Sequence, residues 1–306
     1  MGGAPIVAMS CFPRKIKPAP ERSQRFFSAF DLAGRAGKLL RAGGFLWLFL
    51  ALLPGMGGCQ VGSKSGGHAL CIAGSTSVQP FAEKLAEVYM QQRPGMRIDV
   101  QGGGSSAGIF AAQQGAANLG ASSRELVPAE KNLHEIAIAW DGIAVIVHPS
   151  NPLKNLSLQQ LRQLFQGQIT NWQDLGLPAH AIDLITREEG SGTREAFEHM
   201  VMGKTEFTSS ALVQDSNGSV REIVAGDPSS LGYISAGLVD ERVKTVAIDG
   251  VLPTREDIKN QTYKLVRRFL LVSLVPPAGE CKTFMDFVLG PQGQRLLEAE
   301  GLVGVK

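Results

Sequence analysis

The sequence predicts an α/β fold from residue 69 onward, because short apolar runs alternate with amphipathic segments. Residues 69–73 have the length of a strand and stop at a glycine, whereas residues 81–92 carry apolar side chains at helical spacing. This alternation continues to the end of the chain. A chain of 306 residues is also long enough for two modest domains, each with its own core.

The expected elements follow one another in chain order. The expected strands cover residues 69–73, 97–100, 136–147 (one strand or two), 184–187, 231–234, 244–248 and 265–275. The expected helices cover residues 81–92, 109–114, 157–166, 194–202, 219–224 and 281–300. Ser157 and Gln160 form a capping-box pattern at the start of the third helix, and Gly167 ends it.

The first 58 residues differ in charge from the rest of the chain. They hold eight Lys and Arg and two Asp and Glu, which leaves 22 basic and 26 acidic residues from Cys59 onward. The later part is therefore mildly acidic, and this charge argues against a nucleic-acid partner. Of its cysteines, Cys71 and Cys281 are expected to be small buried hydrophobes, with an oxidised pair as the alternative.

A short apolar run, FLWLFLALL at residues 45–53, ends near the same boundary. Nine residues are too few to span a bilayer but suit the apolar region of a signal peptide. A basic flank, this run, small residues and Cys59 together resemble a bacterial lipoprotein signal, with Cys59 lipidated as the new N-terminus. An ordinary signal peptide or a buried strand is the alternative. We expect residues 1–58 to be the signal and residues 59–68 a flexible tether.

Three loops share one design, in which a strand ends, small residues with hydroxyl groups follow, and a helix begins. Their sequences are GSTS (74–77), GGGSSAG (102–108) and GSGT (190–193). The N-terminus of a helix presents free N–H groups and attracts anions, and Ser and Thr hydroxyls add further donors. Each loop alone is compatible with ordinary helix capping. Three in one α/β chain predict convergence on a tetrahedral oxyanion.

Two charged residues near these loops refine the prediction. Arg187 lies at the end of a strand-like run, where its guanidinium can donate charge-assisted hydrogen bonds to an anion. Asp141 precedes another apolar run, and a carboxylate beside an anion is repulsive unless the ligand carries a proton. Phosphate carries one at neutral pH and sulfate does not, so Asp141 could select phosphate. A turn or capping role for Asp141 is the alternative.

Several segments resemble the phosphate-binding proteins of phosphate ABC transporters. They are GSTSVQPFAEKLAE, VQGGGSSAGI, WDGIAVIVHPSNPL, LSLQQLRQLFQGQITNW, REEGSGTREAFE and LGYISAGL, in order from about Leu70 onward. The resemblance is to the shorter branch of that family. It implies a type II periplasmic-binding-protein fold with two lobes, a two-segment hinge near residues 142–147 and 231–234, and ligand in the cleft. Lobe 1 would comprise residues 69–144 and 234–306, and lobe 2 residues 145–233.

The resemblance also implies which residues bind phosphate. Carried over position by position, they are Thr76, Ser77, Ser105 or Ser106, Arg187, Ser191, Gly192 and Thr193. The longer branch of the family has an acid in the region matching residues 121–123, where this sequence has none. Because of that departure, Asp141 is the residue expected to accept a hydrogen bond from the protonated phosphate.

The function implied is that of an exported, lipid-anchored, monomeric binding protein. It would capture inorganic phosphate for the permease and ATPase of an ABC importer, without a cofactor and without enzymatic activity. A binding protein for another oxyanion, a phosphate-sensing relative and a phosphoester hydrolase are the alternatives. The five histidines share no catalytic or metal-binding spacing, and residues 102–108 lack the lysine of a nucleotide P-loop. Arg267 and Arg268 are expected on a solvated strand edge.

Overall fold

The computed structural model describes residues 69–305. The predicted signal, tether and Cys59 lie outside these residues. The strands are β1 (Ala69–Gly74), β2 (Arg97–Gln101), β3 (Leu119–Ser122), β4 (His134–Val147), β5 (Asn155–Leu156), β6 (Asp183–Arg187), β7 (Leu212–Gln214), β8 (Ser230–Ser235), β9 (Lys244–Ile248), β10 (Val266–Ser273) and β11 (Val303–Gly304). The α-helices are α1 (Gln79–Gln92), α2 (Ser105–Gln113), α3 (Leu158–Phe165), α4 (Gly192–Phe197), α5 (Asn217–Gly226), α6 (Arg255–Lys259), α7 (Gly279–Leu289) and α8 (Pro291–Ala299).

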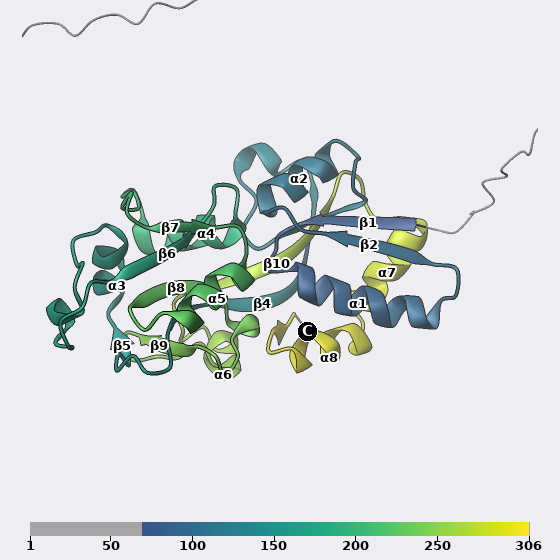
Figure 1. Cartoon of the computed structure of the whole chain (residues 1–306). Coiled ribbons are helices and arrows are strands. Elements are labelled where there is room, and N and C mark those ends of the chain that lie inside the picture. The colour runs from purple at the N-terminus through teal and green to yellow at the C-terminus, as the bar shows by residue number, and fades with distance from the viewer. Residues whose placement is uncertain (1–68, 306) are drawn as a thin grey trace, which may run out of the picture. The chain divides into compact units, whose positions relative to one another are not determined.

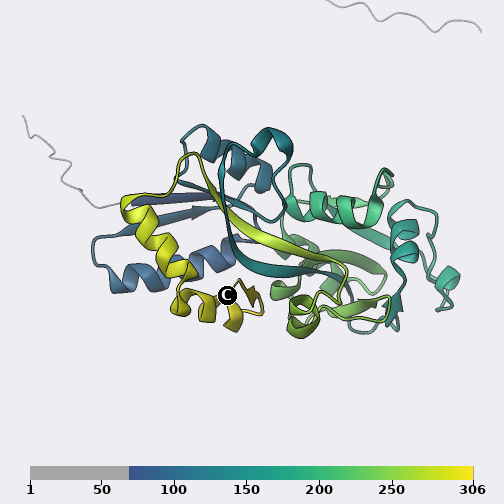
Figure 2. The same cartoon turned by 180° about the vertical axis from the view of Figure 1, so that it is seen from behind.

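Strands and helices alternate as the sequence predicts, and the α/β fold is confirmed. The main path of the sheet has the order β2-β1-β3-β10-β4-β8-β6-β7. The longest strand, β4, pairs antiparallel with β10 over residues 134–142 and with β8 over residues 143–147. Figures 1 and 2 show β4 and β10 side by side, with α1, α2, α7 and α8 toward one end and α3 to α6 toward the other.

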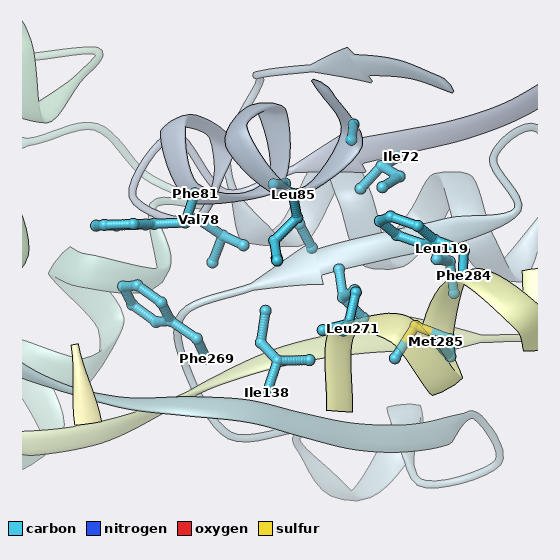
Figure 3. Packing of buried hydrophobic residues seen from close by; sticks show 14 of the residues in the cluster. Ile72, Val78, Phe81, Leu85, Leu119, Ile138, Phe269, Leu271, Phe284 and Met285 are labelled. Carbon is cyan, nitrogen blue, oxygen red and sulfur yellow. The ribbon is translucent and has the colours of Figure 1, made fainter. Parts of the chain in front are cut away.

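The apolar side chains form two main cores at these two ends. The first core packs α1, α7 and α8 against β1, β3, β4 and β10, and Figure 3 shows Leu85, Ile138 and Phe269 within it. The second core begins further along β4, at Ile143, and extends to Leu265 just before β10. The chain therefore passes between the cores along β4 and along β10.

This division differs from the lobe boundaries expected from the sequence. Residues 234–306 are expected in lobe 1, but β9 pairs with β4 on the edge opposite β8, and its side chains Val246 and Ile248 pack in the second core. Tyr263 belongs to the second core as well, and its hydroxyl donates to the carbonyl of Ile143 across 2.7 Å. The packing thus favours a boundary near Val266 in β10 rather than at residue 234.

The other element predictions have mixed outcomes. Ser157 caps α3 in a capping box with Gln160, as predicted. The helix expected at residues 281–300 is wrong as a single element, because it divides at Gly290 into α7 and α8. Pro291 occupies the first turn of α8, where a residue without an N–H is tolerated. The short strands β3 and β7 were not predicted, since neither has a distinctive apolar run.

Two further observations concern the chemistry of the described chain. Cys71 and Cys281 are both free thiols, so they do not form the alternative oxidised pair. Both are only partly buried, so the expected burial is wrong. Between residues 69 and 305, no helix combines the length and the apolar character needed to cross a membrane.

Candidate functional site

The structure brings the three predicted loops together. Ser77 follows β1 and Thr193 lies in the first turn of α4, and their hydroxyl oxygens are 2.7 Å apart although 116 positions separate them in the chain. The second loop joins the third through its backbone, because the amide of Ser106 donates to the carbonyl of Gly190 across 3.1 Å. β1 is parallel to β3 and β6 is parallel to β8, so the two loops follow the ends of strands in two different parallel pairs.

Small side chains permit this close approach. Gly192 opens α4, and a Cβ atom at this position would come within 2.1 Å of Ser105 Oγ and 2.7 Å of Ser123 Oγ. The amide of Ser123 donates to Ser105 Oγ across 3.1 Å, and the hydroxyl of Ser75 donates to Ser123 Oγ across 2.9 Å. All four residues are buried. Gly192 therefore lies directly against a group of serine hydroxyls.

Arg187 ends β6 with its side chain only 1% exposed. Its Nη2 donates to the hydroxyl of Thr76 across 3.1 Å and to the carbonyl of Asp215 across 3.0 Å, and its Nε donates to Glu188 across 3.0 Å. Its Nη1 is buried and has no hydrogen-bond partner among residues 69–305. A buried guanidinium donor without an acceptor is costly, so an anionic acceptor at this place would stabilise it.

Asp141 lies on β4 directly opposite Arg267 of β10. Arg267 Nε donates to Asp141 Oδ2 across 2.9 Å, and Nη2 lies 2.8 Å from the same oxygen. The hydroxyl of Ser235 donates to Oδ1 across 2.8 Å. Burial raises the pKa of Asp141, whereas Arg267 and Ser235 act in the opposite direction. Both carboxylate oxygens therefore already accept hydrogen bonds, and the predicted contact with a phosphate proton stays a prediction.

The expectation that Arg267 and Arg268 both lie on a solvated edge is wrong for Arg267. Arg267 is 5% exposed, and its Nη1 donates to Thr193 Oγ1 across 2.8 Å. Arg268 pairs instead with two glutamates that are partly exposed. Successive side chains of a strand point to opposite faces, and Leu265 and Phe269 on either side of Arg267 are buried. This alternation is the sequence signal that could have identified Arg267.

Ser106 has different partners from its neighbour Ser105. The Ser106 hydroxyl donates to Glu195 Oε1 across 2.9 Å and accepts from Arg124 Nη2 across 3.1 Å. Arg124 Nε lies 2.6 Å from Glu195 Oε2, and its two terminal nitrogens donate to Glu130 across 2.7 and 2.9 Å. We call Ser106, Arg124, Glu130 and Glu195 the rim cluster. Because the rim cluster occupies Ser106, the geometry favours Ser105 as a ligand contact.

Several further residues belong to the assembly and were not predicted as site residues. They include Ser75, Ser123, Arg124, Asn217, Ser235 and Arg267. Asn217 opens α5, and its Nδ2 donates to Ser77 Oγ across 2.9 Å while its Oδ1 accepts from the amide of Ser235 across 3.1 Å. Asn217 stands before a glycine, a pair typical of turns, so its sequence context gives no sign of this position.

The charges of the site suit an anion. Among residues 69–305, the buried Arg, Lys, His, Asp and Glu residues are three arginines and one acid, namely Arg124, Arg187, Arg267 and Asp141. The surrounding hydroxyls and amides add neutral hydrogen-bond donors, and guanidinium groups bind oxyanions strongly. The same residues contain no cluster of His, Cys, Asp and Glu arranged to hold a metal ion. The arrangement is thus able to bind an oxyanion by hydrogen bonds and charge.

Comparisons with known proteins agree with this geometry. Residues 60–292 match the PBP superfamily domain. The phosphate-binding protein PstS of Bacillus subtilis is 30% identical over 234 residues, which cover 74% of this chain and 77% of that protein. A phosphate-bound crystal structure from Clostridium perfringens, assigned as a phosphate ABC transporter substrate-binding protein, is 41% identical with a TM-score of 0.76, covering 78% of this chain and 100% of that one. An ABC-type phosphate transport receptor from Vibrio cholerae is 36% identical with a TM-score of 0.66, covering 76% and 99%.

Proposed function

We propose that this chain, which belongs to the PBP superfamily and within it to the phosphate-binding proteins, captures inorganic phosphate outside the cytoplasm for an ABC importer. The observation that carries the proposal is the buried Arg187, whose Nη1 has no partner among the described residues and whose Nη2 contacts Thr76. A phosphate oxygen is the acceptor that such a donor lacks. The names of the relatives, which refer to phosphate binding and phosphate transport, support the same ligand.

The proposed ligand contacts come from the three loops and from the end of β6. They are Thr76, Ser77, Ser105, Arg187, Ser191, Gly192 and Thr193. Gly192 lets its backbone approach a small ligand closely, since it has no side chain. Asp141 is proposed to influence which oxyanion binds, through its ion pair with Arg267.

Titration calorimetry with phosphate, sulfate, arsenate and molybdate tests the proposal. We expect phosphate to bind, and we expect Arg187→Met to weaken all four anions together. A hydrogen bond to a charged group contributes about 1.5–3 kcal/mol, so each affinity should fall roughly tenfold to a hundredfold or more. Arg295→Met, which removes an exposed arginine from α8, is the control and should bind as the wild type does. A wild-type protein that binds none of the four anions would contradict the proposed function.

The two cores support a two-lobed protein that closes on its ligand. We place the first crossing between lobes in β4 near Asp141 and Gly142, and the second in β10 near Val266 and Arg267. These are the places where consecutive residues pass from one core to the other. The second crossing replaces the one expected near residues 231–234. Closure needs only these two strands to bend, as in hinge motions of other binding proteins.

Membrane attachment through Cys59 remains part of the proposed function. The sequence pattern around Cys59 supports it, and several acyl chains hold a protein firmly where one would be marginal. We expect the wild-type protein to partition into the detergent phase of a detergent extraction, and Cys59→Ser to appear in soluble or unprocessed form. Wild-type protein in the aqueous phase would contradict the anchor. The importer's permease and ATPase are the proposed partners, and the binding protein itself is proposed to act as a monomer.

A further inference from the structure

Six residues at the crossing of β4 and β10 form a closed hydrogen-bonded ring through their side chains and, at Ser235, through the backbone amide as well. In order around the ring they are Asp141, Arg267, Thr193, Ser77, Asn217 and Ser235, and the ring returns from Ser235 to Asp141. The six steps measure 2.9, 2.8, 2.7, 2.9, 3.1 and 2.8 Å in that order. No member is more than 5% exposed. The ring includes loop residues from both sides of the site.

The direction of the hydrogen bond from Asn217 is fixed by its other partner. The amide nitrogen of Ser235 can only donate, so the Asn217 atom that faces it is the acceptor, Oδ1. The amino group Nδ2 is therefore turned to Ser77 and donates to its hydroxyl oxygen. Arg267 has no acceptor, so it also donates, to the hydroxyl oxygen of Thr193.

These two fixed donors leave one hydroxyl hydrogen in surplus. Ser77 and Thr193 each accept from a fixed donor, and between them they have two hydroxyl hydrogens. Their contact of 2.7 Å uses one hydrogen, whichever residue donates it. The other hydrogen has no acceptor among the described residues, because neither hydroxyl makes another hydrogen bond. The pair is therefore set to donate to an acceptor outside the ring.

We propose that Asn217 is a positioning residue that fixes Ser77 and Thr193 as donors toward the ligand. The inference rests on the proposed function, in which the ligand is an oxyanion rich in acceptor oxygens. Asn217 does not need to touch the ligand, since it acts by filling an acceptor position on Ser77. A ligand that presents only donors to this pair would find one free lone pair, because three hydrogen bonds already use the other three, and the ring would disfavour such a ligand.

Asn217→Asp tests this polarity because the two side chains have nearly the same shape. A carboxylate still accepts from the amide of Ser235, but it accepts from Ser77 as well and so removes the surplus hydrogen. It also places a negative charge beside the ligand. We expect phosphate affinity to fall at least about tenfold. The phosphate affinity of Asn217→Ala should fall less, because the Ser77 hydroxyl keeps its hydrogen and can turn toward the ligand.

The uncharged variant Asn217→Ala separates positioning from mere structural support, because Asn217→Asp also adds a charge that repels any anion. If Asn217 served only to accept from Ser235, folded Asn217→Ala would bind phosphate like the wild type. The positioning role predicts weaker phosphate binding by Asn217→Ala and still weaker binding by Asn217→Asp. It also predicts that the loss of phosphate affinity in Asn217→Asp, measured against the wild type at each pH, becomes smaller as pH falls. Burial raises the pKa of a carboxyl group, and the protonated carboxyl can donate to Ser77.

Asn155→Asp provides the matched control. Asn155 also accepts a backbone hydrogen bond through its side chain, from Gly250 across 2.7 Å, but it is exposed and lies outside the ring. We expect this variant to bind phosphate like the wild type in calorimetry, with folding checked by circular dichroism.

If the wild type binds no phosphate, the proposed function fails and this inference fails with it. If the wild type binds and Asn217→Asp equals it, the inference alone is overturned. If Asn217→Asp does not fold, the phosphate affinity of Asn217→Ala decides between the two roles. A phosphate affinity within about twofold of the wild type then overturns the inference.

Discussion

At the scale of single residues, the Asp141–Arg267 pair sets the charge at the centre of the site. The Arg267 side chain is 3% exposed and that of Asp141 is 0% exposed, so neither charge is screened by water. Removing one partner of a buried pair leaves the other charge uncompensated, which is far more costly than the pair is worth. Because Arg267 also donates to Thr193, a change at Asp141 should reach the proposed ligand contacts through Arg267.

Asp141→Asn is therefore expected to change anion selectivity. The substitution leaves the Arg267 charge unpaired, which attracts any anion, and it replaces a carboxylate that repels fully deprotonated anions such as sulfate. We expect sulfate affinity to rise relative to phosphate, and the free energy of unfolding to fall by about 3–5 kcal/mol. Competition titrations of the two anions and denaturant unfolding would measure both effects. Asp183→Asn, at an exposed aspartate, is the control, and an unchanged phosphate-to-sulfate ratio would contradict the role of Asp141 in selectivity.

At the scale of elements, the rim cluster connects the segment after β3 with helix α4. Arg124 donates to both oxygens of Glu130 and lies beside Glu195, and its side chain is only 7% exposed. Burial raises the pKa of Glu130, but the Arg124 guanidinium and the amide of Val127 outweigh burial, so the pKa of Glu130 is lowered overall. Glu130 therefore stabilises the folded protein in its ionised form.

The lowered pKa of Glu130 predicts a specific pH dependence. A carboxyl group with a depressed pKa stabilises the folded state above its ordinary pKa and loses this effect as pH falls through the lowered value. We expect Glu130→Gln to lower the free energy of unfolding by about 1–3 kcal/mol at pH 7. The difference from wild type should shrink as pH falls toward 3. Glu206→Gln, at an exposed glutamate, should show neither effect, and a difference that grows in acid would contradict the prediction.

Elements were predictable where the signal is local. The capping box of α3 and the loops after β1 and β6 depend on residues a few positions apart, and these predictions agree with the structure. The break between α7 and α8 had a local signal as well, Gly290 followed by Pro291, which the helical pattern on both sides obscured. In contrast, the contact of Ser77 with Asn217 joins residues 140 positions apart, and no local pattern specifies such a pair.

At the scale of the whole described chain, two cores share only the long strands β4 and β10 as continuous elements. Ser105, which opens α2, and Ser123, which follows β3, meet Gly192, which opens a helix of the second core. The site therefore depends on how closely the parts of the chain that hold the two cores approach one another. A residue at this contact can affect the distance between these two sides without disturbing the packing of either core.

Gly192→Ala uses this contact to test closure. The added Cβ would lie 2.1 Å from Ser105 Oγ and 2.9 Å from Ser105 Cβ, so the two sides could not approach as they do here, although each core keeps its own packing. We expect wild-type protein to show a smaller radius of gyration in small-angle scattering with phosphate than without it. Gly192→Ala should show little compaction and weakened phosphate binding, with near wild-type unfolding. Gly226→Ala is the matched control, because a Cβ there meets nothing within 4 Å. Compaction of Gly192→Ala equal to wild type, or wild-type binding without any compaction, would contradict closure of the two sides on the ligand.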